Sequence, residues 1–205
     1  MATTTPNYGW PVPTSTDYVK DGATAIEALG DAIDATVFGL PSAGLTLVKA
    51  QTIGSAVSSV TVTSAFSATY DNYLITLSGG VASTTTGLNL TLGATATQYY
   101  RGGNFTSYTG TTVSGINSSN AASWLSASLG TTTSLDGRIE LYDPFLTKNT
   151  KIRATYVSTV TNGESYIFGG FLNDTTSYTA FTLTPNTGGA TMTGGTIRVY
   201  GYKNS

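Results

Sequence analysis

Acid and base chemistry in this chain depends on eleven Asp and Glu residues, because the sequence contains no His and no Cys. This composition excludes Ser-His-Asp and Cys-His catalysis, His-ligated zinc and thiolate metal sites. A glycoside hydrolase needs two carboxylates flanking one bond, and the candidate pairs are Glu140 with Asp143 and Glu164 with Asp174. Strand periodicity puts Glu140 on the same face as Arg138, which is typical of a solvated ion pair. We therefore expect no catalytic residues and no enzymatic activity.

The acidic residues also do not form a pattern that is typical of a metal site. Asp143 and Asp174 are the acidic residues considered for calcium, but neither lies in a loop dense in oxygen ligands. The sequence predicts no metal site and no cofactor.

Aromatic residues near the middle of the chain are the candidates for ligand binding. Charge is scarce, so a bound carbohydrate would be held by stacking and neutral hydrogen bonds. The candidate receptor contacts are Tyr99, Tyr100, Arg101, Tyr108 and Trp124. The alternative is that several of these side chains belong to a hydrophobic core or to a contact between subunits.

The first thirteen residues are extended in character and rich in proline and aromatic side chains. Proline lowers the entropy lost on docking, and Tyr and Trp provide large contact areas. We expect this segment to have no helix or strand of its own and to anchor the chain on another protein. The anchoring residues are Tyr8, Trp10, Pro11, Val12 and Pro13.

A single helix is predicted over Thr14–Val37, with several N-cap candidates between Thr14 and Asp17. Val19, Ile26 and Ile33 are one heptad apart, and Leu29 falls at an alternate seam position, which is the a/d pattern of a short coiled coil. An isolated helix of this length is marginal in water. The apolar side of the helix therefore needs a partner.

Two partners for the helix remain open from the sequence. It packs either on the chain's own β-domain or against the same helix of symmetry mates. In the second case the chain is a homotrimer, and the contacts are Val19, Ile26, Leu29 and Ile33.

The rest of the chain is low in charge and rich in Thr, Ser and Gly. Charged residues make up 10%, against about 25% in typical soluble domains. The net charge of −2 comes without a basic stripe, so we expect no nucleic-acid binding. No apolar stretch reaches the length of a membrane span, and no signal peptide is recognisable. Synthesis in a cytoplasm without membrane insertion is expected.

About ten short segments of this region have β-strand patterns separated by turn residues. They are Leu45–Ile53, Val57–Val62, Tyr73–Ser78, Leu88–Leu92, Gln98–Arg101, Arg138–Tyr142, Lys151–Val157, Ser165–Phe171, Tyr178–Leu183 and Thr196–Tyr202. Turns are expected at Gly79-Gly80, Gly102-Gly103, Asp136-Gly137, Asn162-Gly163 and Gly188-Gly189. The segment from Gly102 to Leu135 interrupts this spacing of strands and turns. It is interpreted either as an irregular excursion that contains a strand or short helix, with Trp124 in the core, or as a ligand- or receptor-facing surface.

These patterns predict an all-β fold: an antiparallel sandwich or jelly-roll-like head, preceded by an arm and one short helix. The expected organisation is an anchoring arm over residues 1–13, a helix and linker over 14–40, and a head domain over 41–205.

The opening TPNYGWPVPTSTDYVKDGATAIEALGDAID resembles the N-terminal segment of tail-associated proteins of tailed bacteriophages, namely minor tail proteins and tail fibres. FSATYDNYLI at Phe66–Ile75 and GTIRVYGY at Gly195–Tyr202 resemble pieces of phage fibre β-domains. The resemblance implies a virion structural protein that is homotrimeric and supplies no catalytic residue.

The expected function is that of a tail fibre or tail-tip protein that takes part in attachment to the host surface. Its expected partners are two further copies of itself, another virion protein at the arm, and a host carbohydrate. A capsid decoration protein is the first alternative, and a cellular carbohydrate-binding β-sandwich is the second.

Overall fold

The computed structural model describes residues 3–12, 14, 18–39, 44–159 and 163–204. It divides into two compact units, residues 1–43 and residues 44–205. The arm and helix expected as separate segments form one unit, which we call the N-terminal unit. The second unit is the head.

The N-terminal unit consists of a small β-hairpin and a helix. Strands β1 (Thr3–Thr4) and β2 (Pro11–Val12) pair in antiparallel fashion. A 3-10 turn η1 (Val19–Asp21) leads directly into the helix α1 (Gly22–Gly39). The expectation of an arm without strands of its own is therefore wrong, because the segment turns back on itself.

The helix begins later than the sequence predicts. Tyr18 precedes η1 and makes no side-chain capping bond. Of the expected N-cap residues, Ser15, Thr16 and Asp17 lie outside the described residues. The predicted end at Val37 is close to the observed end at Gly39.

The head is all-β, and every pairing between its strands is antiparallel. Its strands are β3 (Leu45–Thr52), β4 (Val60–Val62), β5 (Asn72–Ser78), β6 (Val81–Ala82), β7 (Thr86–Leu92), β8 (Tyr99–Ser107), β9 (Val113–Ala121), β10 (Trp124–Gly130), β11 (Leu135–Tyr142), β12 (Lys151–Ser158), β13 (Glu164–Leu172), β14 (Phe181–Pro185), β15 (Met192–Thr193) and β16 (Thr196–Tyr202). The predicted fold class is confirmed.

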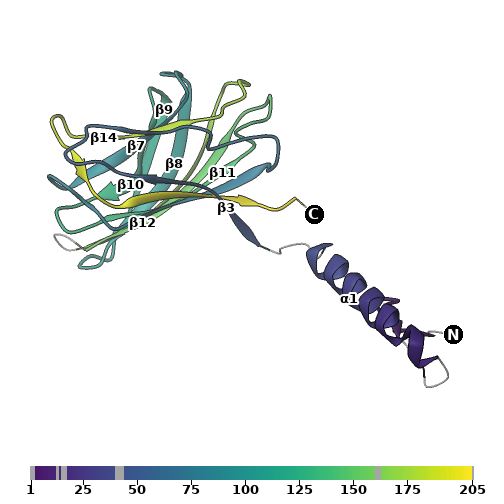
Figure 1. Ribbon diagram of the computed structural model, residues 1–205. Helices are drawn as coiled ribbons and strands as arrows, with labels where there is room; N and C mark the ends of the chain where they lie inside the picture. The colour runs from purple at the N-terminus through teal and green to yellow at the C-terminus, as the bar shows by residue number, and fades with distance from the viewer. Residues whose placement is uncertain (1–2, 13, 15–17, 40–43, 160–162, 205) are drawn as a thin grey trace. The chain divides into compact units, whose positions relative to one another are not determined.

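Two layers of unequal width make up the head. The wide sheet has the order β3-β16-β5-β11-β12-β13-β8-β9, and the narrow sheet has the order β4-β14-β7-β10. They are joined where the start of β11 pairs with β10. Figure 1 shows β16, the last strand in the chain, lying beside β3, the first strand of the head.

Alternating side chains of both sheets form one hydrophobic core. In β7 every second residue is buried, and β12 alternates in the same way between its two faces. This period of two is the one expected for strands with one face toward a core. The largest fully buried side chains include Trp124, Tyr73 and Phe168.

All ten predicted strands are present, with shifts at some of their ends. Residues 102–135 are more regular than predicted, because β8 continues to Ser107 and β9 and β10 follow. The expected position of Trp124 in the core is confirmed, whereas a ligand-facing loop is not what the segment forms. Threonine and serine in this segment alternate between the two faces of a sheet. Their low hydrophobicity conceals the strand period.

Two of the predicted turns lie inside strands instead. Gly102-Gly103 lies within β8 and Asp136-Gly137 lies within β11. The turn expected at Asn162-Gly163 joins the paired strands β12 and β13, and Gly163 has the positive φ of 62° that favours glycine. Asn162 itself lies outside the described residues.

Candidate functional site

The outer face of the wide sheet carries the most distinctive surface of the head. Antiparallel register places Glu140 of β11 opposite Arg153 of β12, Arg153 opposite Gly169 of β13, and Gly169 opposite Gly102 of β8. Residues opposite one another in neighbouring strands point to the same face of a sheet. A carboxylate, a guanidinium and two positions without side chains therefore form one row across four strands.

A hollow of about 460 Å³ lies over this row. Gly102 and Gly169 contribute no side chain to it, and Asn104, Ile167 and Thr155 border it together with the charged residues. Gly102, Asn104, Ile167 and Gly169 are exposed. The hollow is therefore floored by strand backbone and rimmed by side chains.

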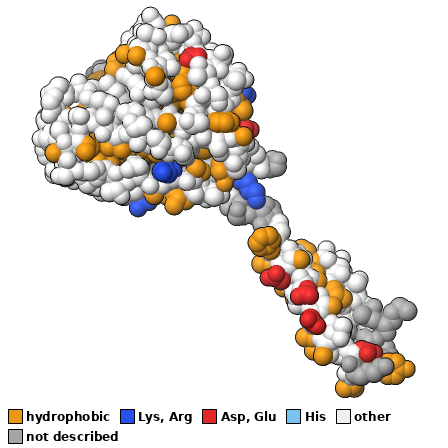
Figure 2. Space-filling model, turned by 45° about the horizontal axis from the view of Figure 1, so that its top comes forward, with side chains coloured by type: hydrophobic (Ala, Val, Ile, Leu, Met, Phe, Trp, Pro, Cys, Tyr) orange, Lys and Arg blue, Asp and Glu red, His pale blue; other side chains and the backbone are white. Residues whose placement is uncertain are grey.

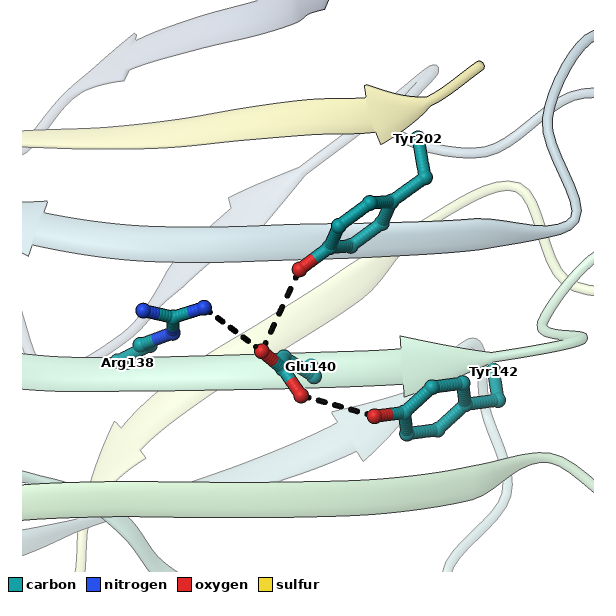
Figure 3. A network of polar contacts seen from close by, with 4 residues as sticks. All are labelled: Arg138, Glu140, Tyr142 and Tyr202. Atoms are coloured by element: carbon teal, nitrogen blue, oxygen red, sulfur yellow. Dashed lines mark hydrogen bonds and ion pairs between the residues drawn. The ribbon is translucent and has the colours of Figure 1, made fainter. Parts of the chain in front are cut away.

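At one end of the hollow, Glu140 is the centre of a polar network (Figure 3). Arg138 Nη2 lies 2.9 Å from Glu140 Oε1, and Tyr142 donates a hydrogen bond of 2.8 Å to Oε2. Tyr202 of β16 donates a longer bond of 3.3 Å to Oε1. Partial burial alone would raise the pKa of Glu140, but the bonds from Tyr142 and Arg138 outweigh it and lower that pKa. Glu140 is an anion at neutral pH and accepts hydrogen bonds.

Arg153 has no such partner. Glu140 is its cross-strand neighbour but turns toward Arg138 and the two tyrosines. Within the described part of the chain, no hydrogen bond or ion pair of the Arg153 side chain is present. An exposed guanidinium therefore borders the hollow with its donors free.

A second hollow of about 250 Å³ shares Gly102 and Gly169 with the first. It is bordered by Tyr100 and Phe171, whose rings stack with centroids 4.9 Å apart and planes 5° from parallel. A third hollow, of about 470 Å³, shares Arg138 and other residues with the first on its other side. The three hollows form one groove along the outer face, aromatic at one end and charged near its middle.

Two of the five predicted receptor contacts belong to the core. Trp124 and Tyr99 are both 0% exposed, and their rings meet edge to face at 4.9 Å. Trp124 Nε1 donates to the backbone oxygen of Tyr100 at 3.3 Å, and burial raises the pKa of Tyr99 to about 12. Their interpretation as ligand contacts is wrong, because a side chain enclosed between two sheets cannot reach a ligand.

Arg101 also points to the inner side of the wide sheet. Its guanidinium donates to the backbone oxygen of Leu125 and to the Tyr166 hydroxyl, and it lies 5.5 Å from the centre of the Phe168 ring. These contacts make it a structural residue, which corrects the prediction. Tyr100 lies on the outer face beside the groove, and Tyr108 is 59% exposed in the β8–β9 connection.

Asp143 and Asp174, considered for catalysis and for calcium, are held by other partners. Asp143 pairs with Lys148 at 3.2 Å and with Lys151 at 3.1 Å. Asp174 accepts hydrogen bonds from Tyr178 and Thr176. Among the described residues, no group of three or more acidic side chains is placed to hold a metal ion.

In the N-terminal unit the predicted seam residues differ in exposure. Val19 and Ile26 are 97% and 65% exposed, whereas Leu29 and Ile33 are half-buried. None of the described residues of α1 is fully buried. The a positions of the first two heptads, Val19 and Ile26, thus expose apolar side chains to solvent.

The arm lies against the helix through the face that carries Thr36. Trp10 Nε1 donates a hydrogen bond of 2.9 Å to Thr36 Oγ1, and the Tyr8 ring stacks on Trp10 with centroids 5.2 Å apart. Pro11 and Val12 are half-buried, while Tyr8 is 62% exposed. Pro13 lies outside the described residues. Of the predicted anchoring residues that the structure describes, Tyr8 alone exposes most of its side chain to solvent.

Charge divides unevenly between the two units. Residues 1–43 contain five acidic residues and one lysine, a net charge of −4, and the head has eight basic and six acidic residues, a net charge of +2. Figure 2 shows acidic side chains gathered on the N-terminal unit, while the visible face of the head is mostly neither charged nor hydrophobic. Three of the eight basic residues of the head, Arg138, Lys151 and Arg153, lie on the outer face of β11 and β12.

Sequence reasoning missed Arg153 and the open glycines Gly102 and Gly169. Two Gly-Gly pairs, at 102–103 and 169–170, were the available signal, but glycine pairs are also typical of turns. No protein-family model, curated protein or solved structure matches this chain. No helix in the described part of the chain combines the length and apolar character of a membrane span.

Proposed function

We propose that this chain is a structural protein of a tailed-phage virion, a tail-fibre or tail-tip protein that assembles as a homotrimer and takes part in attachment to the host. One observation carries the proposal. Val19 in the 3-10 turn η1 and Ile26 in α1 are exposed to solvent at heptad spacing, and α1 has no fully buried residue among those described. An apolar stripe of this kind is stabilised when equivalent helices pack on it.

The acidic residues of the helix support the same arrangement. If Val19, Ile26 and Ile33 occupy the a positions, Asp21, Glu27, Asp31 and Asp34 all fall at b, c or f. These positions face away from the seam of a coiled coil, and all four residues are exposed. Packing three helices together therefore places no carboxylate at the centre.

Sedimentation of the full chain tests the assembly. We expect the wild type to sediment as a trimer at micromolar concentration and Ile26→Asp to dissociate it, because three carboxylates would be brought close together in an apolar seam. Thr24→Asp is the matched control, since Thr24 is exposed at an f position. A monomeric wild type, or equal effects of both substitutions, would contradict the proposal.

Docking of the arm on another virion protein is a separate part of the proposal. The exposed Tyr8 ring and the stiff Pro11–Val12 strand support it, since a preformed aromatic surface loses little entropy on binding. A variant lacking residues 1–13 should contain a normally folded head and fail to enter particles. Its normal incorporation would refute this role.

Electron microscopy of labelled particles locates the protein. A few copies at one vertex would agree with a tail protein. Hundreds of copies over the shell would show that the chain decorates the capsid instead.

A further inference from the structure

Glycine is an unfavourable residue inside a β-strand unless the backbone requires it. Four glycines occupy the middle of β8 and β13, and they differ in what a side chain would meet. A Cβ atom built on Gly103 would lie 2.2 Å from the Ile167 carbonyl oxygen, and one on Gly170 would lie 2.2 Å from the Tyr100 oxygen. Close packing accounts for these two glycines.

Gly102 and Gly169 have no such explanation. A Cβ atom on Gly102 would meet nothing within 4 Å, and one on Gly169 would meet only the Ile152 oxygen at 3.8 Å. Neither residue has a positive φ. Their effect is to keep the hollow on the outer face open at the point where two strands run side by side.

The free guanidinium of Arg153 lies at the border of this open floor. Its planar donor pair fits a carboxylate in two-point geometry. The anionic Glu140 beside it accepts hydrogen bonds and so matches the hydroxyl groups of a sugar. The stacked Tyr100 and Phe171 rings provide an apolar platform further along the groove.

We infer that the groove over Gly102 and Gly169 binds an extended, carboxylate-bearing glycan, with an acidic sugar held by Arg153 and its neighbours placed along the strand backbone. The inference extends the attachment role proposed above by naming its ligand class. It departs from the binding by stacking and neutral hydrogen bonds expected from the sequence, because the unpaired cation Arg153 lies next to the open floor. An elongated groove made of three adjoining hollows suits a chain of several sugars.

Binding of a defined oligogalacturonate to the purified full chain tests the inference, with a neutral malto-oligosaccharide of equal length as the comparison. We expect calorimetry to detect the acidic sugar alone. Arg153→Gln should weaken binding about tenfold or more, as expected for loss of a charge-assisted contact. Arg198→Gln is its matched control, because Arg198 lies on the same face, bonds to Ser78 and does not line the hollows.

Gly102→Val tests the floor of the groove independently of charge. It should abolish binding without lowering the melting temperature, since a Cβ atom at this position meets nothing within 4 Å and valine is favourable in a strand. Gly115→Val is the matched control on β9, where a Cβ atom also meets nothing within 4 Å. Gly115→Val should leave binding intact.

Three outcomes would overturn the inference: no binding of oligogalacturonate by the wild type, equal binding of the neutral oligomer, or equal loss with Arg198→Gln. A sulfated dextran that binds as tightly as oligogalacturonate and resists Gly102→Val would show a purely ionic surface and would also overturn it. These measurements do not depend on the oligomeric state. A monomeric chain would contradict the proposed trimer but would not affect the interpretation of the glycan-binding measurements.

Discussion

The head and the N-terminal unit differ most in how they use their apolar residues. The head encloses residues of both sheets, such as Trp124, Phe181 and Ile139, at 0% exposure. The helix α1 has no fully buried residue among those described, and Ile26 in α1 and Val19 in the preceding turn η1 are exposed. Burial of apolar surface is the main stabilising contribution in folding. The head therefore contains the source of its own stability, whereas the N-terminal unit leaves much of its apolar surface in contact with solvent.

The described carboxylates of the two regions also differ in whether they have bonding partners. In the head, Glu140, Asp143 and Asp174 are bonded to basic or hydroxyl groups. The carboxylates of α1, Glu27, Asp31 and Asp34, are exposed. The three bonded carboxylates of the head are therefore held in fixed positions, whereas those of the helix face solvent.

The largest expected effect comes from the two tryptophans, one in each unit. Trp124→Ala should lower the free energy of unfolding of the head by roughly 3–5 kcal/mol, because it leaves a large cavity between the sheets. Trp10→Ala should leave the unfolding of the head unchanged. Denaturant titration followed by circular dichroism at strand wavelengths measures both. Equal effects would contradict the independence of the two units.

Removal of the bond between the arm and the helix should have an intermediate effect. Thr36→Val keeps the shape of the side chain but removes the acceptor for Trp10 Nε1, at a cost of about 1 kcal/mol within the N-terminal unit. Chymotrypsin should then cleave after Tyr8 or Trp10 faster than in the wild type. Thr24→Val, on an exposed position of the same helix, should leave the cleavage rate unchanged.

The smallest expected effect is on the stability of the head at low pH. The folded head lowers the pKa of Glu140 through bonds from Tyr142 and Arg138 that outweigh its partial burial, so the unfolded chain binds the proton more tightly. The stabilisation is present above the unfolded value of about 4.3 and is lost as the pH falls through the lower folded value. Glu140→Gln should cost about 1 kcal/mol or less at pH 7 and make the acid decline in unfolding free energy shallower. A steeper decline in the variant would contradict the assignment.

The sequence predicts the strands of the head well where apolar and polar residues alternate. Thr196–Tyr202 and Lys151–Val157 are examples, because one face of each strand is buried and the other is accessible to solvent. It fails for β9 and β10, where small hydroxyl side chains stand on both faces and the period disappears. It also fails for the arm, whose pairing of Thr3–Thr4 with Pro11–Val12 depends on packing against α1 and not on strand propensity.

The groove could be predicted only in part. The pairing of Arg138 with Glu140 follows from strand parity and is present at 2.9 Å. The row of Arg153, Gly169 and Gly102 depends on the register of β12, β13 and β8, in which Gly102 comes 67 residues before its partner Gly169. Such long-range register is not encoded in any local pattern. The aromatic candidates Tyr99 and Trp124 were misplaced because strand parity alone does not say which face is covered.

The pairing of β3 with β16 has a mechanical consequence. Leu45, at the start of the head, stands opposite Tyr202 near its end, and within the described sheet β3 bonds to β16 alone. If the chain is held by its N-terminal unit, as proposed, tension reaches the head through β3. The hydrogen bonds between these two strands are then loaded one after another from the Leu45 end. We expect this edge pair to separate first when a bound head is pulled, while the inner strands that form the groove keep their register.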